Sequence, residues 1–222
     1  MELEKFARLG TKRVKWLVHL FNWTVGLNSI RKGKNKISIG AAMLKKVKIR
    51  VSGRGNTIVV SDWSALLGCT IHIKGNNNRI EIGSDCVLRQ VELVVEDDGN
   101  EISVGKGGRL YGPTQLAAME GTKLSIGEEC LCSSGVKIRT GDSHSIVDME
   151  GNRINPSTDV EIGSHVWLGT DVLCLKGTRV PGNCIVGARA LVNRAFSEEN
   201  CILAGVPAQI VKNRVSYLCK RL

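Results

Sequence analysis

The chain has 222 residues, of which 42% are hydrophobic but only 4% aromatic, so its core must be built mainly from aliphatic side chains. The formal net charge is +10, yet residues 1–50 carry 13 Lys and Arg against 2 acidic residues, whereas residues 51–222 carry 18 against 19. Because the positive charge is confined to one end and is not spread over a binding face, the distribution argues against a nucleic-acid-binding protein.

Residues 1–32 predict a basic amphipathic helical segment. Its apolar residues recur at helical spacing, at Trp16, Leu17, Leu20, Phe21, Trp23 and Leu27. Basic residues recur on another face, at Lys5, Arg8, Lys12 and Lys15. The apolar stretch is shorter than the roughly 20 residues needed to span a bilayer. Two interpretations therefore stay open: the helix packs on the protein or a neighbouring subunit, or it lies on an anionic membrane surface with tryptophan at the interface.

Internal repeats begin near residue 53. The aliphatic residues Ile58, Ile80, Ile102 and Leu124 are each 22 residues apart, and corners rich in Gly, Asn and Asp separate short strands. After residue 160 the period shortens to six, and three hexads make a triangular coil of about eighteen residues. We predict an all-β fold, a parallel β-helix shaped as a triangular prism over 33–195, with a short C-terminal cap over 196–222. The longer early coils carry about four extra residues at one corner.

Eight cysteines occur in the chain. Six of them fall at small or aliphatic positions of the repeat: Cys69, Cys86, Cys130, Cys132, Cys174 and Cys184. None forms a CxxC pair, and no secretory signal precedes them. We expect reduced core thiols in a cytoplasmic protein, and no metal site.

The stretch 162–212 carries a specific set of motifs: Trp-Leu-Gly after a coil, Gly-Ala before the last hexad, and the closing "AGVPAQIVK". These motifs resemble the bacterial hexapeptide-repeat acetyltransferases, whose prism is left-handed. The upstream "IRTGDSHSI" and "GNRINPS" resemble the branch that O-acetylates capsule and other cell-surface polysaccharides, including sialic acid polymers. The resemblance implies a homotrimer with active sites in clefts between neighbouring prisms.

The aliphatic repeat stops for about twenty residues, and the predicted extruded loop 140–159 contains His144. The resemblance implies that this loop carries the catalytic histidine into the cleft. A sugar hydroxyl holds its proton far above neutral pH, so its attack on a thioester needs a general base, and imidazole is suited to that task. Asp142 is a candidate to orient the ring, although an Asp in a Gly-Asp-Ser turn also serves as a turn former.

The resemblance also implies a set of residues around acetyl-CoA. Trp167 would line the site near the thioester, or would otherwise simply pack. Backbone groups near Thr170 and Ala188 would bind the pantetheine amides. Four further residues take the places of the family's CoA-contacting positions: Asn193, Arg194, Gln209 and Lys212. Arg194 and Lys212 would meet the CoA phosphates, whereas Gln209 departs from the usual basic residue, which weakens that contact.

The predicted function is therefore an acetyl-CoA-dependent O-acetyltransferase acting on a sugar hydroxyl of a cell-surface polysaccharide or its precursor, in a ternary complex with His144 as general base. Two alternatives stay open. One is N-acetylation of an amino sugar on a nucleotide carrier, and the other is a non-catalytic β-helix scaffold held at the membrane by its basic helix. Four scattered histidines do not match the three converging His ligands of a zinc-dependent relative.

Overall fold

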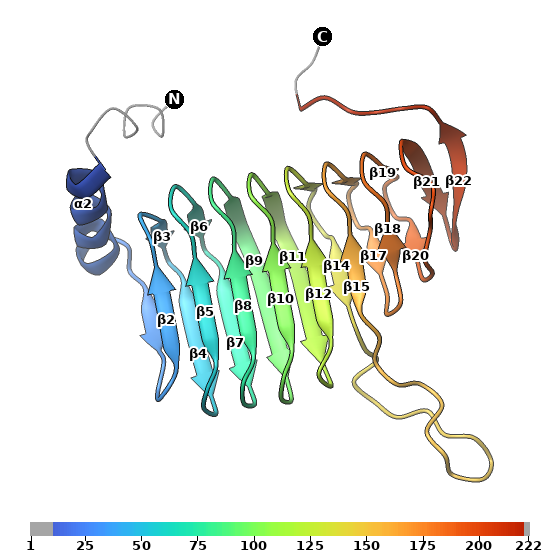
Figure 1. Ribbon diagram of the computed structural model, residues 1–222, viewed down its shortest axis with the longest axis horizontal. Helices are drawn as coiled ribbons and strands as arrows, with labels where there is room; N and C mark the ends of the chain where they lie inside the picture. Colours follow the sequence, from blue (N-terminus) through green and yellow to red (C-terminus); the bar gives the residue numbers. More distant parts are fainter. Residues whose placement is uncertain (1–10, 220–222) are drawn as a thin grey trace.

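The computed structural model of the chain describes residues 11–219. The predicted basic positions Lys5 and Arg8, and the side chain of Lys12, lie outside what it describes. Parallel strands coil into a three-sided prism, with helix α2 (Thr11–Thr24) at one end and a strand hairpin at the other (Figure 1). The predicted parallel β-helix is confirmed.

Each face of the prism is a stack of parallel strands, one from each coil. Face 1 contains β3 (Met43–Lys45), β6 (Ala65–Leu67), β13 (Leu131–Cys132), β16 (Trp167–Leu168), β19 (Ile185–Val186) and β21 (Cys201–Gly205). Face 2 contains β1 (Ser29–Arg31), β4 (Lys48–Ser52), β7 (Thr70–Lys74), β14 (Lys137–Arg139), β17 (Leu173–Cys174) and β20 (Leu191–Val192). Two long strands bend across both of these faces, β9 (Val87–Glu96) and β11 (Arg109–Met119).

Face 3 is a separate sheet of seven strands: β2 (Lys36–Ile39), β5 (Thr57–Val60), β8 (Arg79–Ile82), β10 (Glu101–Val104), β12 (Lys123–Ile126), β15 (Val160–Ile162) and β18 (Arg179–Val180). Three corners join the faces. The asparagine corner, which includes residues 75–78, leads from face 2 to face 3. The His165 corner, which includes residues 163–166, leads from face 3 to face 1. The Thr170 corner, which includes residues 169–172, leads from face 1 to face 2.

The two predicted coil lengths are confirmed by the strand register. Ile80 pairs with Ile102, 22 residues on, whereas Trp167 pairs with Ile185, 18 residues on. The four extra residues lie at the asparagine corner. Ten residues lead from the face 2 position Gln115 to the face 3 position Ser125, but only six lead between the equivalent positions Leu173 and Arg179.

Stacking of identical positions builds the core. The positions Ile58, Ile80, Ile102, Leu124 and Val160 form one buried aliphatic ladder. A second, polar ladder runs up the asparagine corner. There the side-chain amide of Asn78 donates to Asn56 Oδ1 at 3.0 Å, and that of Asn100 donates to Asn78 Oδ1 at 3.1 Å. These asparagines are buried, and their bonding between coils satisfies the polar groups that a tight corner would otherwise leave unpaired.

The six cysteines predicted to be core thiols are all buried and free, as is Cys201, and the exposed cysteine is Cys219. Burial raises the pKa of the Cys130 thiol to about 11 and that of Cys174 to about 12, so both stay protonated at neutral pH. They act as small hydrophobic side chains.

Both ends of the prism are covered. Helix α2 packs on β3, where the side-chain amide of Asn22 donates to Ala42 O and its Oδ1 accepts from Leu44 N, each at 2.8 Å. At the other end β22 (Ala208–Asn213) pairs antiparallel with β21. Among residues 11–219 no helix is long and apolar enough to cross a membrane.

Candidate active site

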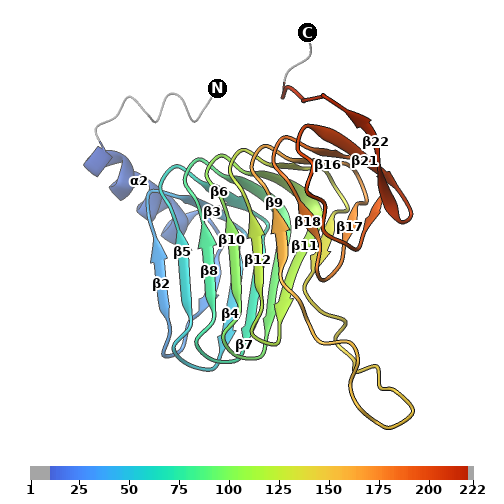
Figure 2. The ribbon, with the colours of Figure 1, turned by 45° about the vertical axis from the view of Figure 1, so that its right-hand side comes forward.

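The loop 140–159 leaves the prism at the asparagine corner (Figure 2). The strands on either side of the loop, β14 and β15, keep their registers on faces 2 and 3. However, 24 residues lead from Lys137 to Glu161, which is fourteen more than lead from Gln115 to Ser125 in the preceding coil. The extrusion therefore replaces the compact asparagine turn of earlier coils. The extrusion begins beside Gly141, where a side chain would not fit. A Cβ at this position would lie 2.1 Å from Ser157 Oγ and 2.8 Å from Met119 Sδ.

The loop is an ordered hairpin. Val147 and Arg153 form an antiparallel bridge, and at the tip the Asp148 carboxylate accepts from the backbone N–H groups of Glu150 and Asn152 at 3.1 and 2.8 Å. Arg153 is tied to Glu120 of the neighbouring coil by an ion pair of 2.7 Å. This ion pair holds the pKa of the Glu120 carboxyl below its ordinary value. The hairpin is thus fixed to the prism at its side as well as at its root.

Asn155 holds the segment that carries His144. Its side-chain amide donates to the His144 carbonyl at 2.8 Å and to Asp142 Oδ2 at 2.8 Å, and its Oδ1 accepts from Ile146 N at 2.7 Å. Asn155 is 6% exposed, whereas His144 is exposed. The network fixes the main chain on both sides of His144 and leaves the imidazole free to meet another group.

Asp142 contributes to this anchor. Its Oδ2 accepts from Lys176 Nζ at 2.6 Å and from the Asn155 amide, and these bonds hold the pKa of the carboxyl below its ordinary value. Within residues 11–219 the His144 ring has no hydrogen bond to Asp142 or to another group. Asp142 therefore orients the histidine segment through Asn155 and not through a direct bond to the ring.

Trp167 begins face 1, beside the His165 corner. Its Nε1–H donates to Ser133 Oγ at 3.1 Å, and the Tyr217 ring of the C-terminal tail lies 5.8 Å from it. Tyr217 also stacks on His165, with ring centroids 4.4 Å apart, and donates its hydroxyl hydrogen to Glu129 O at 3.0 Å. The tail thus fixes one side of Trp167, while the indole stays partly exposed.

The predicted CoA-contacting residues fall into two groups. Thr170 and Ala188 are at the Thr170 corner, where neighbouring coils lie so close that a Cβ on Gly169 would be 2.8 Å from Ala188 N. The other group continues the asparagine corner past β20. There Arg194 donates to Gln209 Oε1 and stacks over the Phe196 ring at 4.9 Å. Asn193 and Lys212 are exposed.

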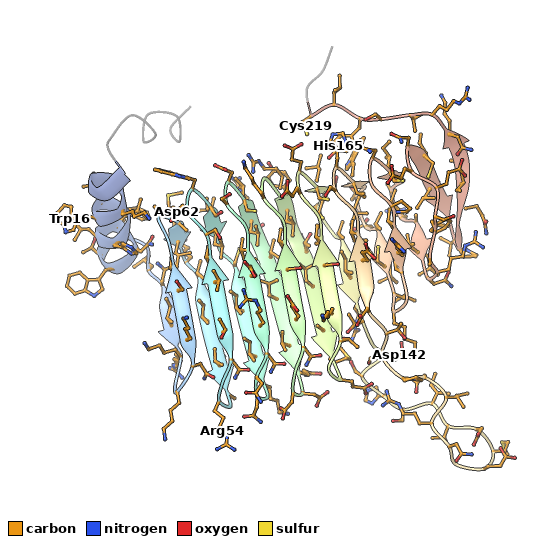
Figure 3. The ribbon with its side chains drawn as sticks, viewed as in Figure 1. Trp16, Arg54, Asp62, Asp142, His165 and Cys219 are labelled. Carbon is orange, nitrogen blue, oxygen red and sulfur yellow. The ribbon has the colours of Figure 1, made fainter. Side chains whose placement is uncertain are left out.

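One chain alone does not bring all these residues together. The His144 loop and Arg194 are at the asparagine corner, Trp167 is beside the His165 corner, and Thr170 is at the third corner. Figure 3 shows Asp142, at the loop root, and His165 at opposite edges of the prism, with face 3 between them. A histidine on this loop can meet Trp167 only on another molecule or after a large loop movement.

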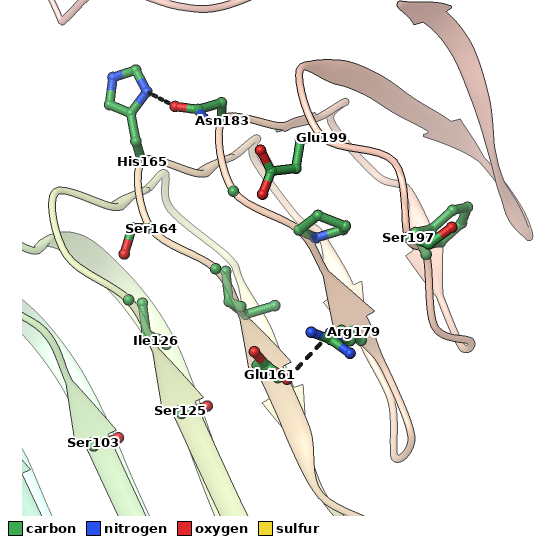
Figure 4. A pocket seen from close by; sticks show the side chains of 16 residues that line it. Ser103, Ser125, Ile126, Glu161, Ser164, His165, Arg179, Asn183, Ser197 and Glu199 are labelled. Carbon is green, nitrogen blue, oxygen red and sulfur yellow. Dashed lines mark hydrogen bonds and ion pairs between the residues drawn. The ribbon is translucent and has the colours of Figure 1, made fainter.

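A polar hollow of about 750 Å³ lies on face 3 near the C-terminal coils (Figure 4). Glu161 and Arg179 on its floor form an ion pair of 3.3 Å, and at its edge His165 Nδ1 hydrogen-bonds Asn183 Oδ1 at 3.2 Å. The hollow offers hydroxyl, carboxylate and guanidinium groups to a polar ligand. Among the described residues no His, Cys, Asp and Glu side chains are grouped to hold a metal ion.

Sequence reasoning missed the parts played by Asn155 and Tyr217. Asn155 belongs to "GNRINPS", a stretch that carried part of the resemblance, but nothing in its spacing indicated that it would reach back eleven residues to His144. Tyr217 is one of two tyrosines and lies within the predicted cap, where the sequence has no periodic pattern. No sequence pattern links Lys176 to its partner Asp142, which is 34 residues away.

No family model matches the chain. A polysialic acid O-acetyltransferase of Neisseria meningitidis is 34% identical to it over 185 residues, which cover 82% of this chain and 85% of that protein. The aligned part therefore spans most of both proteins.

Two solved structures are similar over nearly the same extent. The polysialic acid O-acetyltransferase OatWY superposes with a TM-score of 0.77 and 30% identity, covering 88% of this chain and 92% of that chain. The polySia-specific acetyltransferase NeuO superposes with a TM-score of 0.78 over 87% and 88% of the two chains, at 23% identity, which speaks for the fold. The predicted left-handed β-helix is confirmed by these likenesses.

Proposed function

Because this chain is an acetyltransferase of the hexapeptide-repeat family, in the branch that includes the polysialic acid O-acetyltransferases, we propose that it acetylates a hydroxyl group of a cell-surface polysaccharide or its precursor. Family membership also removes the non-catalytic scaffold as an alternative. The single observation that supports the proposal best is the ordered hairpin that presents His144 to solvent at the only long interruption of the described prism.

His144 is the general base of the proposed reaction. Its neutral ring nitrogen accepts the proton of the sugar hydroxyl as that oxygen attacks the thioester carbonyl carbon of acetyl-CoA. The tetrahedral intermediate then expels CoA thiolate, and the imidazolium returns the proton to the sulfur. No covalent acyl-enzyme is needed, and the seven buried cysteines are inaccessible. A positioned base of this kind contributes roughly 10²–10⁴-fold.

The donor, acetyl-CoA, is a substrate whose shape fits the edge of the prism. Tight coil packing at Gly169 and Ala188 leaves a smooth edge with backbone groups for the pantetheine amides, and Trp167 offers a flat ring near the thioester. Arg194 and Lys212 supply positive charge for the phosphates. Gln209 supports Arg194 through their hydrogen bond, which compensates in part for its own lack of charge.

The enzyme is a homotrimer in this proposal, because the site needs groups from two chains. A cyclic trimer repeats one contact three times, so a loop at the asparagine corner of one protomer reaches the Trp167 side of the next. We place the enzyme in the cytoplasm, where acetyl-CoA is available and buried thiols stay reduced.

Complementation between inactive variants tests the shared site. His144→Ala and Trp167→Ala proteins are each expected to be nearly inactive, and randomly mixed trimers should recover activity at about a quarter of the sites, since each site then draws one intact residue from each chain. A site built within one chain would recover none. Mass spectrometry of the glycans measures the acetyl groups added.

The acceptor and the donor need separate experiments. A panel of polysaccharides, their hydroxyl sugars and nucleotide-linked amino sugars is incubated with acetyl-CoA, and a mass increase only on the amino sugars would replace O-acetylation by N-acetylation. Thermal stabilisation by CoA, saturating with concentration, is expected for the donor site. Loss of that stabilisation in Arg194→Ala, with Arg54→Ala as a matched control at the far end of the prism, would support the phosphate contact.

A further inference from the structure

The outer side of α2 is an exposed apolar strip at the N-terminal end of the prism. Trp16 and Trp23 are 64% and 85% exposed, Leu20 on the same helix is 39% exposed, and Leu27, which follows the end of α2, is 73% exposed. Figure 3 shows Trp16 on the side of α2 that points away from the prism. Two free tryptophans together on one surface are uncommon in a soluble protein, since burial of each ring is strongly favourable.

The tryptophans are exposed although α2 is firmly attached to the prism, as the contacts on its inner side show. Asn22 and Asn28 bond to the first coil, the latter donating to Leu44 O at 3.0 Å and accepting from Val47 N at 2.9 Å. Lys15 forms an ion pair of 3.0 Å with Asp62 in the second coil. The helix is therefore held in a fixed orientation, with its tryptophans outward.

Positive charge surrounds the apolar strip. Residues 11–50 contain eleven Lys and Arg and no Asp or Glu. Several of these basic side chains are exposed on the first coil, which lies beneath α2: Arg31, Lys32, Lys34, Lys36, Lys45, Lys46, Lys48 and Arg50. Because the first coil is the end of the stack, these charges form a ring around the same end of the molecule that carries the strip.

We propose that this end binds the surface of an anionic phospholipid membrane, with Trp16, Leu20 and Trp23 entering the interface and the ring of Lys and Arg facing the headgroups. Tryptophan is favoured at the boundary between headgroups and acyl chains, and basic residues are attracted to an anionic leaflet. A membrane covers both features at once. The proposal goes beyond the acetyl transfer reaction and does not depend on it.

Two other occupants fit less well. A second copy meeting this end symmetrically would bring like charges together, which opposes association. A soluble polyanion would neutralise the basic ring but would leave the apolar strip in water. In the trimer proposed above, three-fold symmetry turns all three ends to the same side, and simultaneous binding of three helices would strengthen attachment.

The test is co-sedimentation of the full-length protein with vesicles of phosphatidylcholine alone and of phosphatidylcholine with an equal amount of phosphatidylglycerol. We expect binding only to the vesicles with phosphatidylglycerol, weakened by salt. Trp16→Ser/Trp23→Ser and Lys32→Glu/Lys34→Glu should each lower the binding at least about tenfold. The matched controls are Leu218→Ser for an exposed apolar residue and Lys106→Glu for an exposed cation of a later coil, and both should bind as the wild type does.

Acetyl transfer to a soluble acceptor should be unchanged in the tryptophan variant, so a failure of the membrane proposal is distinct from a failure of the catalytic one. Equal binding to both kinds of vesicle, or wild-type binding by the tryptophan variant, would overturn the proposal. A lower mass of the tryptophan variant than of the wild type on light scattering would also overturn it, because the strip would then be a subunit contact. Tryptophan-dependent binding of soluble polyphosphate without vesicle binding would assign the surface to a polyanion.

Discussion

In the N-terminal coils the asparagine corner buries Asn56, Asn78 and Asn100 in a continuous ladder, whereas past β14 the same corner sends a hairpin into solvent. The ladder bonds each coil to the next through backbone and side-chain groups. The hairpin instead satisfies its own polar groups through Asp148 and Asn155. One corner can therefore stabilise the stack in one half of a prism and carry an extruded loop in the other, because the faces on either side keep their register.

Replacement of His144 by Ala tests the chemical half of this comparison, and we expect the largest effect there. The loss of the base should lower kcat by roughly 10²–10⁴-fold. The unfolding midpoint should not change, because the ring has no hydrogen bond within the described chain. His72→Ala, on the outer side of β7, is the control. Full activity of the His144 variant would remove this residue from the reaction.

Replacement of Asn78 by Ala tests the structural half. Its side chain bonds to Asn56, Asp97 and Asn100, so the variant leaves buried groups unpaired, at a cost of about 1–3 kcal/mol for each. We expect the free energy of unfolding in urea to fall by about 3 kcal/mol, with unchanged activity per folded molecule. The exposed Asn213→Ala is the control. A variant that lost activity but kept its stability would contradict the division between the two halves.

Replacement of Asn155 by Ala should have a smaller effect on catalysis than loss of His144. The imidazole remains, but its segment loses the bonds to His144 O and Ile146 N, and we expect kcat to fall about tenfold, as is usual when a reacting group is misplaced. KM should change little, and hydrogen exchange at residues 143–147 should become faster. Asn152→Ala, at the hairpin tip, is the control. Wild-type exchange in Asn155→Ala would show that the anchor lies elsewhere.

The pH dependence of the anchor is the smallest expected effect. Because Lys176 and Asn155 lower the folded-state pKa of Asp142, its contribution is fully present above the unfolded value, about 3.9, and is lost as the pH falls through the lowered value. Hydrogen exchange in the hairpin should therefore keep its protection from neutral pH to about pH 5 after correction for intrinsic rates, and lose it below about pH 4. In Lys176→Met the folded-state pKa of Asp142 should lie closer to its unfolded value, so the pH-dependent loss of protection should be smaller.

The fold was predictable because the same pattern of residues recurs in successive coils of a β-helix. Ile58, Ile80 and Ile102 state the coil length three times in the sequence, and each aligned position adds the same ladder contact. The buried cysteines followed from the same periodicity. The hand of the coil came from resemblance alone, since spacing does not distinguish left from right.

The candidate site was predictable only in part. His144 stood out because it breaks a regular pattern. Its support did not, because Asn155 bonds to the His144 carbonyl and Lys176 bonds to Asp142 through contacts that depend on the path of an irregular loop. The position of Tyr217 against His165 and Trp167 depends on how the tail folds back over 88 residues to Glu129, which no local pattern encodes.

The bonds that α2 makes to the first coil have a consequence for assembly. A stack of parallel strands ends in a row of unpaired main-chain donors and acceptors, which can pair with a strand of another molecule. Stacks with such open ends can therefore grow into filaments. Asn22 and Asn28 present amide groups to Ala42, Leu44 and Val47 as a preceding coil would, so the molecule ends there instead of extending. A variant that lacks residues 1–28 should polymerise end to end, and electron microscopy should then show fibres.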